Sequence, residues 1–444
     1  MPRRDFLKAA GAGVAGTALL GSTACDGFTP AVEGTSNSLV FSFGPDDSGV
    51  VQAVIDMFNK KMGGKITVEY REMPADTGQY FDKLRTEFQS GVVVNDVIGA
   101  DVIWPAQLAA NGWLEPLDEL FTEEMQSDYI SAPLDTGRYN DKIYSVPWYA
   151  DAGMLYYRKD LLDKNGIKSP PKTWEELYDI GAKVAGAEGL GYGYVGQGAE
   201  YEGGVCNGCE FVWNGGGEIQ DPKDLAKIVI DSPEAMAGLE AGQKVVSSGV
   251  APVAFATFKE LESLTVFLNQ DAVFMRNWPF AYGGLADPAL GTTFDPKKVY
   301  EQVLVTTLPV TEAGQENFAC LGGWTFAINA LSSKKEQAWE FIKFMITPEI
   351  RETFTIDRAA MPPERSFYED KKLIKEQPLL EVAKDAIAST KPRPIHPYYS
   401  DMSLRMAESF NENIKSEISP QQAISTLQTQ MQRIADTNVP NPNI

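Results

Sequence analysis

The sequence predicts an α/β protein in which a largely parallel sheet is wrapped by helices. Short strand-like segments alternate with segments whose apolar residues recur at helical spacing, and this alternation is typical of such sheets. The chain has 444 residues, of which 43% are hydrophobic and 23% are charged. A chain of this length and composition can bury sizeable cores without disulfide bonds, and it is long enough for two domains.

The first part of the folded chain carries three expected strands and two expected helices. The strand patterns are residues 39–43, residues 66–70 and the apolar run 96–103. Between them, residues 50–61 and 80–88 place apolar side chains on one helical face. Strands that alternate with helices in this way predict a parallel arrangement.

The middle of the chain repeats this pattern and opens a second unit. An extended stretch at 143–147 leads into a strand at 154–158. Thr173, followed three residues later by Glu176, predicts a capping box at the start of a helix. An extended stretch at residues 303–309 could return to the first unit. A strand is expected at 324–328, and helices are expected at 334–345, 404–418 and 423–434.

The N-terminal residues predict export and membrane anchoring. Arg3 and Arg4, followed by Asp-Phe-Leu-Lys, resemble the twin-arginine export signal, and Cys25 ends a sequence similar to a bacterial lipobox. We therefore expect residues 1–24 to be a signal peptide and residues 25–38 to be a lipid anchor with a flexible tether. A membrane-spanning helix is a weaker alternative, because the apolar run is short and rich in glycine and alanine. Cleavage without lipidation is a second alternative, because Ser22 occupies a lipobox position where an aliphatic residue is commoner. The expected location is outside the cytoplasmic membrane, with Cys25 as the membrane anchor.

The charge of the chain excludes one class of partner. The formal net charge is -22, and the leader contributes positive charge, so the remaining chain is more acidic still. Such a surface repels phosphate backbones, so no nucleic-acid partner is expected.

Cysteine and histidine counts disfavour several kinds of chemistry. Besides Cys25, the chain has Cys206, Cys209 and Cys320, which is an odd number for a disulfide framework. A structural zinc site needs four ligands, and only the single His396 could join the three thiols. We expect no metal or other cofactor; packed thiols or a local disulfide between Cys206 and Cys209 remain open.

Five further segments carry a family signal. They occur in order with sensible gaps, at residues 96–117, 146–158, 173–177, 276–282 and 321–330. Together they resemble the extracellular solute-binding proteins of sugar ABC importers, and in particular the trehalose/maltose-binding branch.

The resemblance implies a fold, a division into domains and a set of partners. It implies a two-lobe periplasmic-binding-protein fold of type II, with hinge strands between the lobes and a helix-rich C-terminus. The N-terminal lobe would comprise residues 39–145 and 310–350, and the C-terminal lobe residues 146–309 and 351–444. A monomer of this kind binds a carbohydrate in the cleft and delivers it to the transmembrane subunits of an ABC permease, without catalysis.

Aromatic residues in the matching segments are candidate plates for a sugar ring. Sugars present apolar CH faces, which stack on aromatic rings, and a rim of hydroxyls. Trp278 lies in an Arg-Asn-Trp-Pro turn, Trp324 follows Gly323, and Trp148 lies at the first lobe junction. Without side chains, Gly323 and its neighbour would let a ligand approach the backbone. Packing in a core is the alternative for each tryptophan.

Polar candidates would bind the hydroxyl groups. Asp101 interrupts an apolar strand, and Asp151 lies between apolar residues, so unpaired carboxylates there would be costly in a packed core. The resemblance implies that one faces the cleft from each lobe. It also adds Arg405, Tyr201 and Glu202, with Asp76 and Gln79 as weaker candidates. The alternatives are that Asp101 caps a helix near Trp104, that Asp151 pairs with Arg158, and that Arg405 pairs with Glu408.

Two rival functions use the same residues. Paired carboxylates beside aromatic plates also describe a glycoside hydrolase, with Asp101, Asp151 and Glu202 as its acids. A receptor for a metal ion or a polyamine on the same fold is the second rival, because the tyrosine pairs 156–157 and 398–399 resemble ferric-ion ligands. Tryptophan in the matching loops favours a sugar over both.

Overall fold

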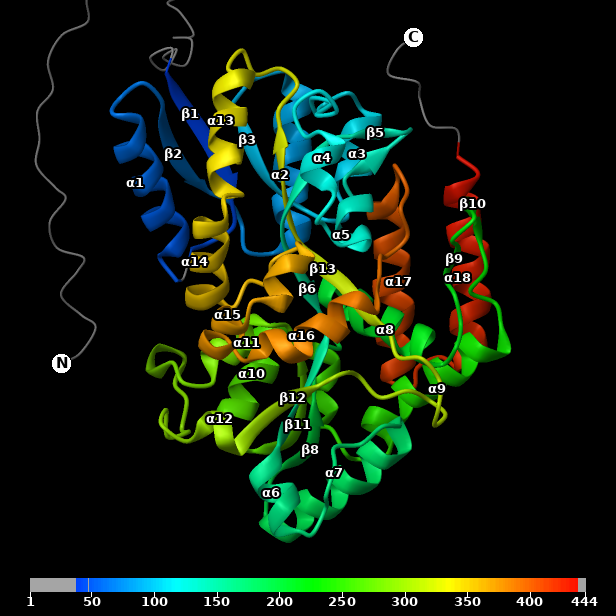
Figure 1. Ribbon diagram of the computed structural model, residues 1–444. Helices are drawn as coiled ribbons and strands as arrows, with labels where there is room; N and C mark the ends of the chain where they lie inside the picture. The colour runs from blue at the N-terminus through cyan, green and yellow to red at the C-terminus, as the bar shows by residue number, and fades with distance from the viewer. Residues whose placement is uncertain (1–36, 47, 438–444) are drawn as a thin grey trace, which may run out of the picture. The chain divides into compact units, whose positions relative to one another are not determined.

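The chain folds around two main β-sheets, and residues 145–158 pass directly from the first into the second. The structure, a computed structural model, describes residues 37–46 and 48–437. The predicted signal peptide and Cys25 lie outside the described residues, so they stay predictions. Figure 1 shows one sheet surrounded by α1, α2 and α13, and the other beside α6 and α7. We call each sheet, with the helices packed on it, the first lobe and the second lobe.

The first sheet has the strand order β14-β13-β3-β1-β2, and β6 also pairs with β13. Strand β1 is parallel to β2 and β3, whereas β13 is antiparallel to β3 and β6. The sheet is therefore mixed rather than purely parallel. Its strands are β1 (Ser38–Phe43), β2 (Thr67–Glu72), β3 (Val97–Asp101), β6 (Ser145–Ala152), β13 (Ala319–Ile328) and β14 (Thr390–Lys391).

Amphipathic helices cover this sheet. The predicted helical face of α1 is buried, with Val51, Val54, Ile55 and Phe58 in the core of the first lobe. Burial of such a face, rather than helix propensity alone, stabilises the helix. The helices and short strands of this lobe are α1 (Val50–Met62), α2 (Thr77–Ser90), α3 (Pro105–Ala110), α4 (Glu123–Gln126), α5 (Ser131–Asp135), β4 (Arg138–Tyr139), β5 (Lys142–Ile143), α13 (Lys335–Met345) and α14 (Pro348–Arg358).

The second sheet has the order β12-β7-β11-β8. Strand β7 runs antiparallel to both β11 and β12, and only β11 and β8 are parallel. The interpretation of 303–309 as a return to the first unit is wrong, because β12 pairs with β7 and the return is made by β13 instead. The strands are β7 (Met154–Arg158), β8 (Tyr192–Val195), β11 (Ala272–Asn277) and β12 (Val303–Thr306).

The second lobe includes the last two helices of the chain, α17 and α18. α17 and α18 pack on α8 and α9 (Figure 1). Helix α7 begins with the predicted capping box: the Thr173 hydroxyl accepts from Glu176 N at 3.2 Å, and Thr173 N donates to the Glu176 carboxylate at 3.3 Å. The remaining elements are α6 (Lys159–Lys164), α7 (Trp174–Glu188), α8 (Glu202–Asn214), β9 (Gln220–Asp221), β10 (Asp224–Ile228), α9 (Pro233–Ser247), α10 (Glu260–Leu268), α11 (Phe280–Gly284), α12 (Val299–Gln302), α15 (Lys371–Glu376), α16 (Leu379–Ala388), α17 (Tyr399–Ile414) and α18 (Pro420–Ala435).

The predicted lobe boundaries fall inside secondary structure. The boundary after residue 350 divides α14, although Ile350 and Phe354 both lie in the core of the first lobe. The boundary after residue 145 falls at the first residue of β6, a strand that pairs with β13 in the first sheet and then leads into β7. Strand β6 is thus shared between the lobes rather than belonging to the second. No helix in the described part of the chain is long and apolar enough to cross a membrane.

Candidate functional site

The two predicted carboxylates flank one strand. Asp101, the last residue of β3, lies opposite Trp324 of β13, and Asp151 of β6 lies opposite Gly322 on the other side of that strand. Strand pairing therefore brings together residues that are far apart in the sequence. Both carboxylates lie where the first sheet passes into the connection to the second lobe.

Two predicted tryptophans lie beside these carboxylates and are partly exposed. The Trp324 ring makes edge contacts with Phe43 and Trp104, at centroid distances of 4.9 and 5.5 Å. The Trp278 ring comes from the second lobe and lies under the Arg276 guanidinium, 4.0 Å from its Cζ, while its Nε1 donates to Glu260 at 3.4 Å. Both indoles are thus fixed by protein on one side and retain some exposure.

The glycine pair before Trp324 has a structural reason that needs no ligand. A Cβ on Gly322 would lie 2.9 Å from Cζ3 of Trp278. Gly323 has a φ of 108°, and a Cβ there would lie 2.2 Å from the carbonyl oxygen of Tyr149 on β6. Protein atoms occupy the space that the sequence analysis assigned to ligand approach, so that reason for choosing Gly323 is wrong. Ligand contact by its backbone stays a prediction.

Asp151 has a carboxylate without a hydrogen-bonding partner among the described residues. Burial raises the pKa of Asp151 to about 7, the nearby Arg358 opposes this shift, and Asp101 adds to it. Arg358 lies over the rings of Phe43 and Tyr149, with its Cζ 5.3 and 5.6 Å from their centroids. Its Nη1 is buried and donates to no acceptor among the described residues. A buried donor and a partly exposed carboxylate are therefore both available at this point.

Arg393, which the sequence analysis did not select, joins the two lobes at Asp101. Its Nη1 donates to Glu202 at 2.6 Å and its Nη2 to Asp101 at 3.3 Å. Glu202, the first residue of α8, also accepts from the hydroxyls of Tyr399 and Ser403. Burial raises the pKa of Asp101 to about 6, Arg393 opposes the shift, and Glu202 adds to it. A small pocket of about 10 Å³, whose lining includes Val102 and Leu321, lies beside this arginine.

Arg405 lies away from this cluster. It is exposed on α17, and its Nη1 donates to Glu408 at 3.0 Å, which is the alternative pairing considered from the sequence. The arginine that reaches the carboxylates is instead Arg393, in the Lys-Pro-Arg-Pro segment before His396. Arg393 reaches this position because β14, just before it, pairs with β13. The local sequence does not reveal that pairing, so it could not identify Arg393. For Asp151, the alternative of a pair with Arg158 is wrong, since Arg158 pairs with Asp160.

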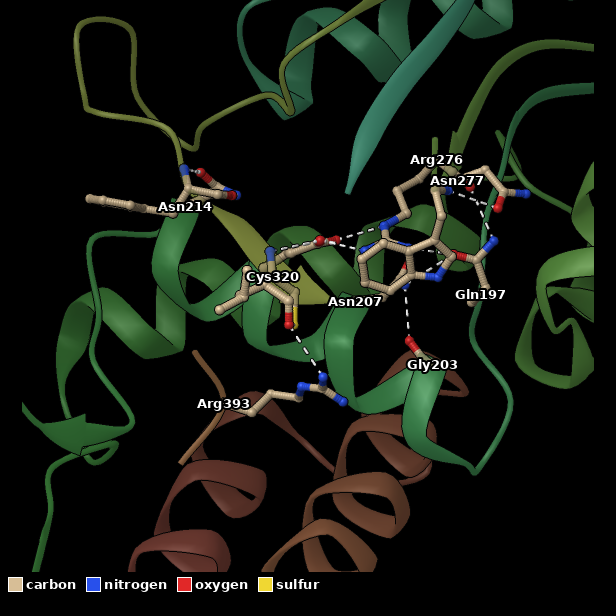
Figure 2. A network of polar contacts seen from close by, with 12 residues as sticks. Gln197, Gly203, Asn207, Asn214, Arg276, Asn277, Cys320 and Arg393 are labelled. Atoms are coloured by element: carbon tan, nitrogen blue, oxygen red, sulfur yellow. Dashed lines mark hydrogen bonds and ion pairs between the residues drawn. The ribbon is translucent and has the colours of Figure 1, made fainter. Parts of the chain in front are cut away.

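A second hydrogen-bond network, around Arg276, supports the Trp278 ring from within the second lobe. Figure 2 shows Arg276 beside Gln197 and Asn207. Its Nε donates to Glu210 at 2.8 Å, and its Nη1 donates to Gln197 at 2.9 Å. Glu210 also accepts from the backbone N–H of Cys320 on β13 at 3.0 Å, which connects α8 to the strand that carries Trp324 (Figure 2).

Three other candidates, Trp148, Asp76 and Tyr201, have contacts within the protein. Trp148 is only 1% exposed and stacks on Phe326 in the core of the first lobe, so its expected role as a plate is wrong and the packing alternative holds. Asp76 is the N-cap of α2 and accepts from Gln79 N at 3.1 Å. Asp76 also pairs with Lys259, whose ammonium lies over the ring of Tyr201.

The thiols and tyrosines are occupied by packing and hydrogen bonds. Cys206, Cys209 and Cys320 are buried and unpaired, so a disulfide between Cys206 and Cys209 is not formed. Tyr156 donates its hydroxyl to the carbonyl of Trp278 at 2.8 Å. Within residues 37–46 and 48–437, no group of three or more His, Cys, Asp and Glu side chains could hold a metal ion.

Comparison with known proteins identifies the family. A "Probable ABC transporter-binding protein" of Deinococcus radiodurans is 29% identical over 387 residues, which is 85% of this chain and 89% of that protein. The maltose-bound T. maritima MalE3 structure superposes with a TM-score of 0.81 at 32% identity, covering 89% of this chain and 99% of the other. The GacH receptor of Streptomyces glaucescens has a TM-score of 0.79 at 21% identity, covering 90% of this chain and 99% of that chain, and shows the shared fold alone. Because residues 44–352 match its family pattern, the chain belongs to the bacterial extracellular solute-binding proteins.

Proposed function

We propose that this protein is a receptor for a neutral di- or oligosaccharide of the maltose or trehalose type, captured between the two lobes and passed to the transmembrane subunits of an ABC importer. The observation that carries the proposal is the unpaired carboxylate of Asp151 beside the unpaired Nη1 of Arg358. Partly exposed indole rings of Trp278 and Trp324 lie at the same strand junction.

The chemistry of this group of residues fits a sugar. A hydroxyl can donate to the Asp151 carboxylate and accept from an Arg358 N–H, and neighbouring hydroxyls on a sugar ring allow both at once. The CH face of the ring can stack on an indole, which excludes water from these hydrogen bonds. Arg393, Asp101 and Glu202 already neutralise much of one another's charge, which favours an uncharged ligand.

The comparisons support carbohydrate as the first ligand class to test. The T. maritima structure at 32% identity was solved with maltose bound. The candidate contacts in this chain are Asp101, Asp151, Arg358, Arg393, Glu202, Trp278 and Trp324. The proposed role is binding without catalysis, with closure of the lobes as the selective step.

The N-terminal residues bear on where the receptor works. We infer that the twin-arginine signal exports the folded chain and that Cys25 is lipidated, which tethers the monomer outside the cytoplasmic membrane. Replacement of Cys25 by serine would release the protein into the soluble fraction and leave carbohydrate affinity unchanged. Retention of the Cys25→Ser protein in the membrane fraction would contradict the lipid anchor.

Calorimetry with a carbohydrate panel tests the proposed function. Purified protein without residues 1–25 is titrated with maltose, trehalose, maltotriose and mannitol, and tryptophan fluorescence is recorded in parallel. Family-like binding would be about micromolar, which corresponds to about -8 kcal/mol. Trp278→Phe should reduce the fluorescence change, whereas Trp148→Phe should lower stability without changing affinity.

Two results would overturn the proposal. Absence of heat and of a fluorescence change with every carbohydrate would contradict the ligand class. Release of reducing sugar from aryl glycosides or disaccharides, abolished by Asp151→Asn, would show a glycoside hydrolase instead.

A further inference from the structure

An ion pair crosses from the first lobe to the second, next in sequence to the residue that accepts from the Trp278 indole. Lys259 Nζ lies 3.0 Å from Oδ2 of Asp76. Asp76 precedes α2, which packs on the first sheet through Tyr80 and Leu84, whereas Lys259 precedes α10, which packs on β11 of the second. The pair is therefore one of several contacts between the lobes, beside Arg393 and the hydrogen bond from the Cys320 N–H to Glu210.

The lysine of this pair has a second partner, the ring of Tyr201, in the second lobe. Its Nζ lies 4.8 Å from the centroid of the Tyr201 ring, a geometry in which a cation is attracted to an aromatic face. Burial of Asp76 raises its pKa, but hydrogen bonds from Lys259 and from Gln79 N outweigh this effect, so the pKa lies below its usual value. Lys259 thus lies between a carboxylate of one lobe and a ring of the other.

The residue after Lys259 reaches the candidate sugar plate. Glu260 accepts from Nε1 of Trp278 at 3.4 Å through its side chain, and from Nδ2 of Asn277 at 3.2 Å through its backbone carbonyl. Two consecutive residues at the start of α10 therefore hold the opposite lobe and the indole. A shift of this turn would move both contacts together.

We propose that Asp76, Lys259 and Tyr201 form a latch that holds the lobes closed and slows release of the ligand. These are positioning residues: they act on the closed population and on Trp278, without contact with the carbohydrate. The inference rests on the proposed function, and it gives Asp76 and Tyr201 a different role from the ligand contact expected from the sequence. A ligand that binds the closed form gains apparent affinity in proportion to the population of that form.

The latch should have a modest, salt-dependent effect. The side chains of Lys259 and Asp76 are 46% and 29% exposed. A partly exposed ion pair contributes little, so its loss should weaken ligand binding about two- to five-fold. Because the Debye length falls from about 30 Å at 0.01 M salt to about 3 Å at 1 M, the effect should shrink at high ionic strength.

The test uses two variants that remove the ion pair and one matched control. Lys259→Met keeps the length of the side chain and removes its charge, and Asp76→Ser keeps an N-cap acceptor for Gln79 N while removing the carboxylate. Lys343→Met is the control, because Lys343 pairs with Glu340 inside α13 alone. The dissociation rate and Kd are measured at low and high salt for the carbohydrate that the wild-type protein binds.

The expected result is faster release and about two- to five-fold weaker binding for Lys259→Met and Asp76→Ser at low salt. The double variant should lose no more than either single variant, since both remove one interaction. Wild-type rates in Lys259→Met would overturn the latch. A loss that persists unchanged at high salt would also overturn it, because direct ligand contact would then explain the effect.

A second measurement separates the latch from the proposed function. If the wild-type protein binds no carbohydrate, the proposed function fails, and the latch is tested in the ligand-free protein by small-angle scattering. The latch predicts a larger radius of gyration for Lys259→Met than for wild type and for Lys343→Met at low salt. Equal radii for all three proteins would contradict it.

Discussion

Two arginines on α14 show how one helix face can serve either the hinge or the site. Arg351 and Arg358 are seven residues apart, so they lie on the same side of the helix. Arg351 is almost fully buried, and each of its nitrogens has an acceptor: it donates to the carbonyls of Pro147 and Trp148, to Tyr129 and to Glu364. Arg358 lies over two aromatic rings and has a buried N–H without a partner among the described residues.

Arg351 therefore has a structural role, whereas Arg358 has an N–H group that a ligand could bind. The two carbonyls that Arg351 binds belong to β6, the strand that leads into the second lobe, so this arginine fixes the root of the hinge. An unpaired buried donor costs free energy, and a ligand acceptor can recover it. The comparison predicts that Arg351 contributes to stability and Arg358 to binding.

The largest expected effect is on Arg351. Arg351→Met would leave Glu364 buried without its cation, and loss of one member of a buried pair costs about 3–5 kcal/mol of the free energy of unfolding. Chemical denaturation measures this change. The double variant Arg351→Met/Glu364→Gln should recover part of the loss, because no buried charge would then remain unpaired. An Arg351→Met protein as stable as wild type would show that Arg351 does not stabilise the fold.

The next effect is on ligand affinity at Arg358. A hydrogen bond to a charged group contributes about 1.5–3 kcal/mol, so Arg358→Met should weaken carbohydrate binding about 10- to 100-fold. Its stability should change little, and Arg358→Lys should recover part of the affinity. Calorimetry and denaturation measured on the same samples would decide this. Unchanged affinity, with a large loss of stability, would place Arg358 in the same class as Arg351.

The carboxylate beside Arg358 predicts a pH dependence with a definite sign. The pKa of Asp151 is raised to about 7 in the folded protein, above about 4 in the unfolded chain. The folded state therefore binds its proton more tightly, and stability is lost as the pH rises from about 4 to about 7. Asp151→Asn removes this loss, whereas the loss at Asp101 remains in both proteins.

Thermal denaturation across this pH range measures the effect. The melting temperature of Asp151→Asn relative to wild type should increase with pH and level off above pH 7. A difference that is the same at every pH would show that the Asp151 carboxylate is not held in the environment described here. At pH 8 the variant should also bind carbohydrate more weakly, because its amide oxygen carries no charge.

The smallest effect is expected at Arg405. Arg405→Gln removes an exposed pair within α17, and such pairs contribute about 0.3–0.5 kcal/mol. Ligand affinity should stay within about two-fold of wild type, whereas Arg393→Gln should weaken binding at least ten-fold, because Arg393 joins Asp101 to Glu202. A ten-fold loss in Arg405→Gln would restore the role that the sequence resemblance implied for this residue.

Local patterns predicted those parts of the fold that depend on neighbouring residues. The periodicity of α1, the capping box at Thr173 and the strand 154–158 are confirmed, because each depends on residues within one or two turns. Strand direction was predicted less well. The antiparallel pairing of β13 with β3 joins segments more than two hundred residues apart, and no local pattern specifies it.

The candidate site shows the same division. Asp101, Asp151, Trp278 and Trp324 were selected because their residue types are unusual in their local contexts, and the structure brings them to one strand junction. Arg358 and Arg393 were missed. Each lies at the end of a segment whose local sequence is ordinary, and its position depends on packing against rings or strands from distant parts of the chain.

Gly323 gives the hinge an unusual sensitivity to size. It adopts a backbone conformation that favours glycine, and a methyl group at this position would meet the carbonyl of Tyr149 on the neighbouring hinge strand. Alanine there would act as a wedge between β6 and β13, the two strands about which the lobes would rotate. One added carbon atom, in a position that need not touch the ligand, could therefore set the resting angle of the receptor, which makes this glycine a point of entry for designing sensors with altered closure.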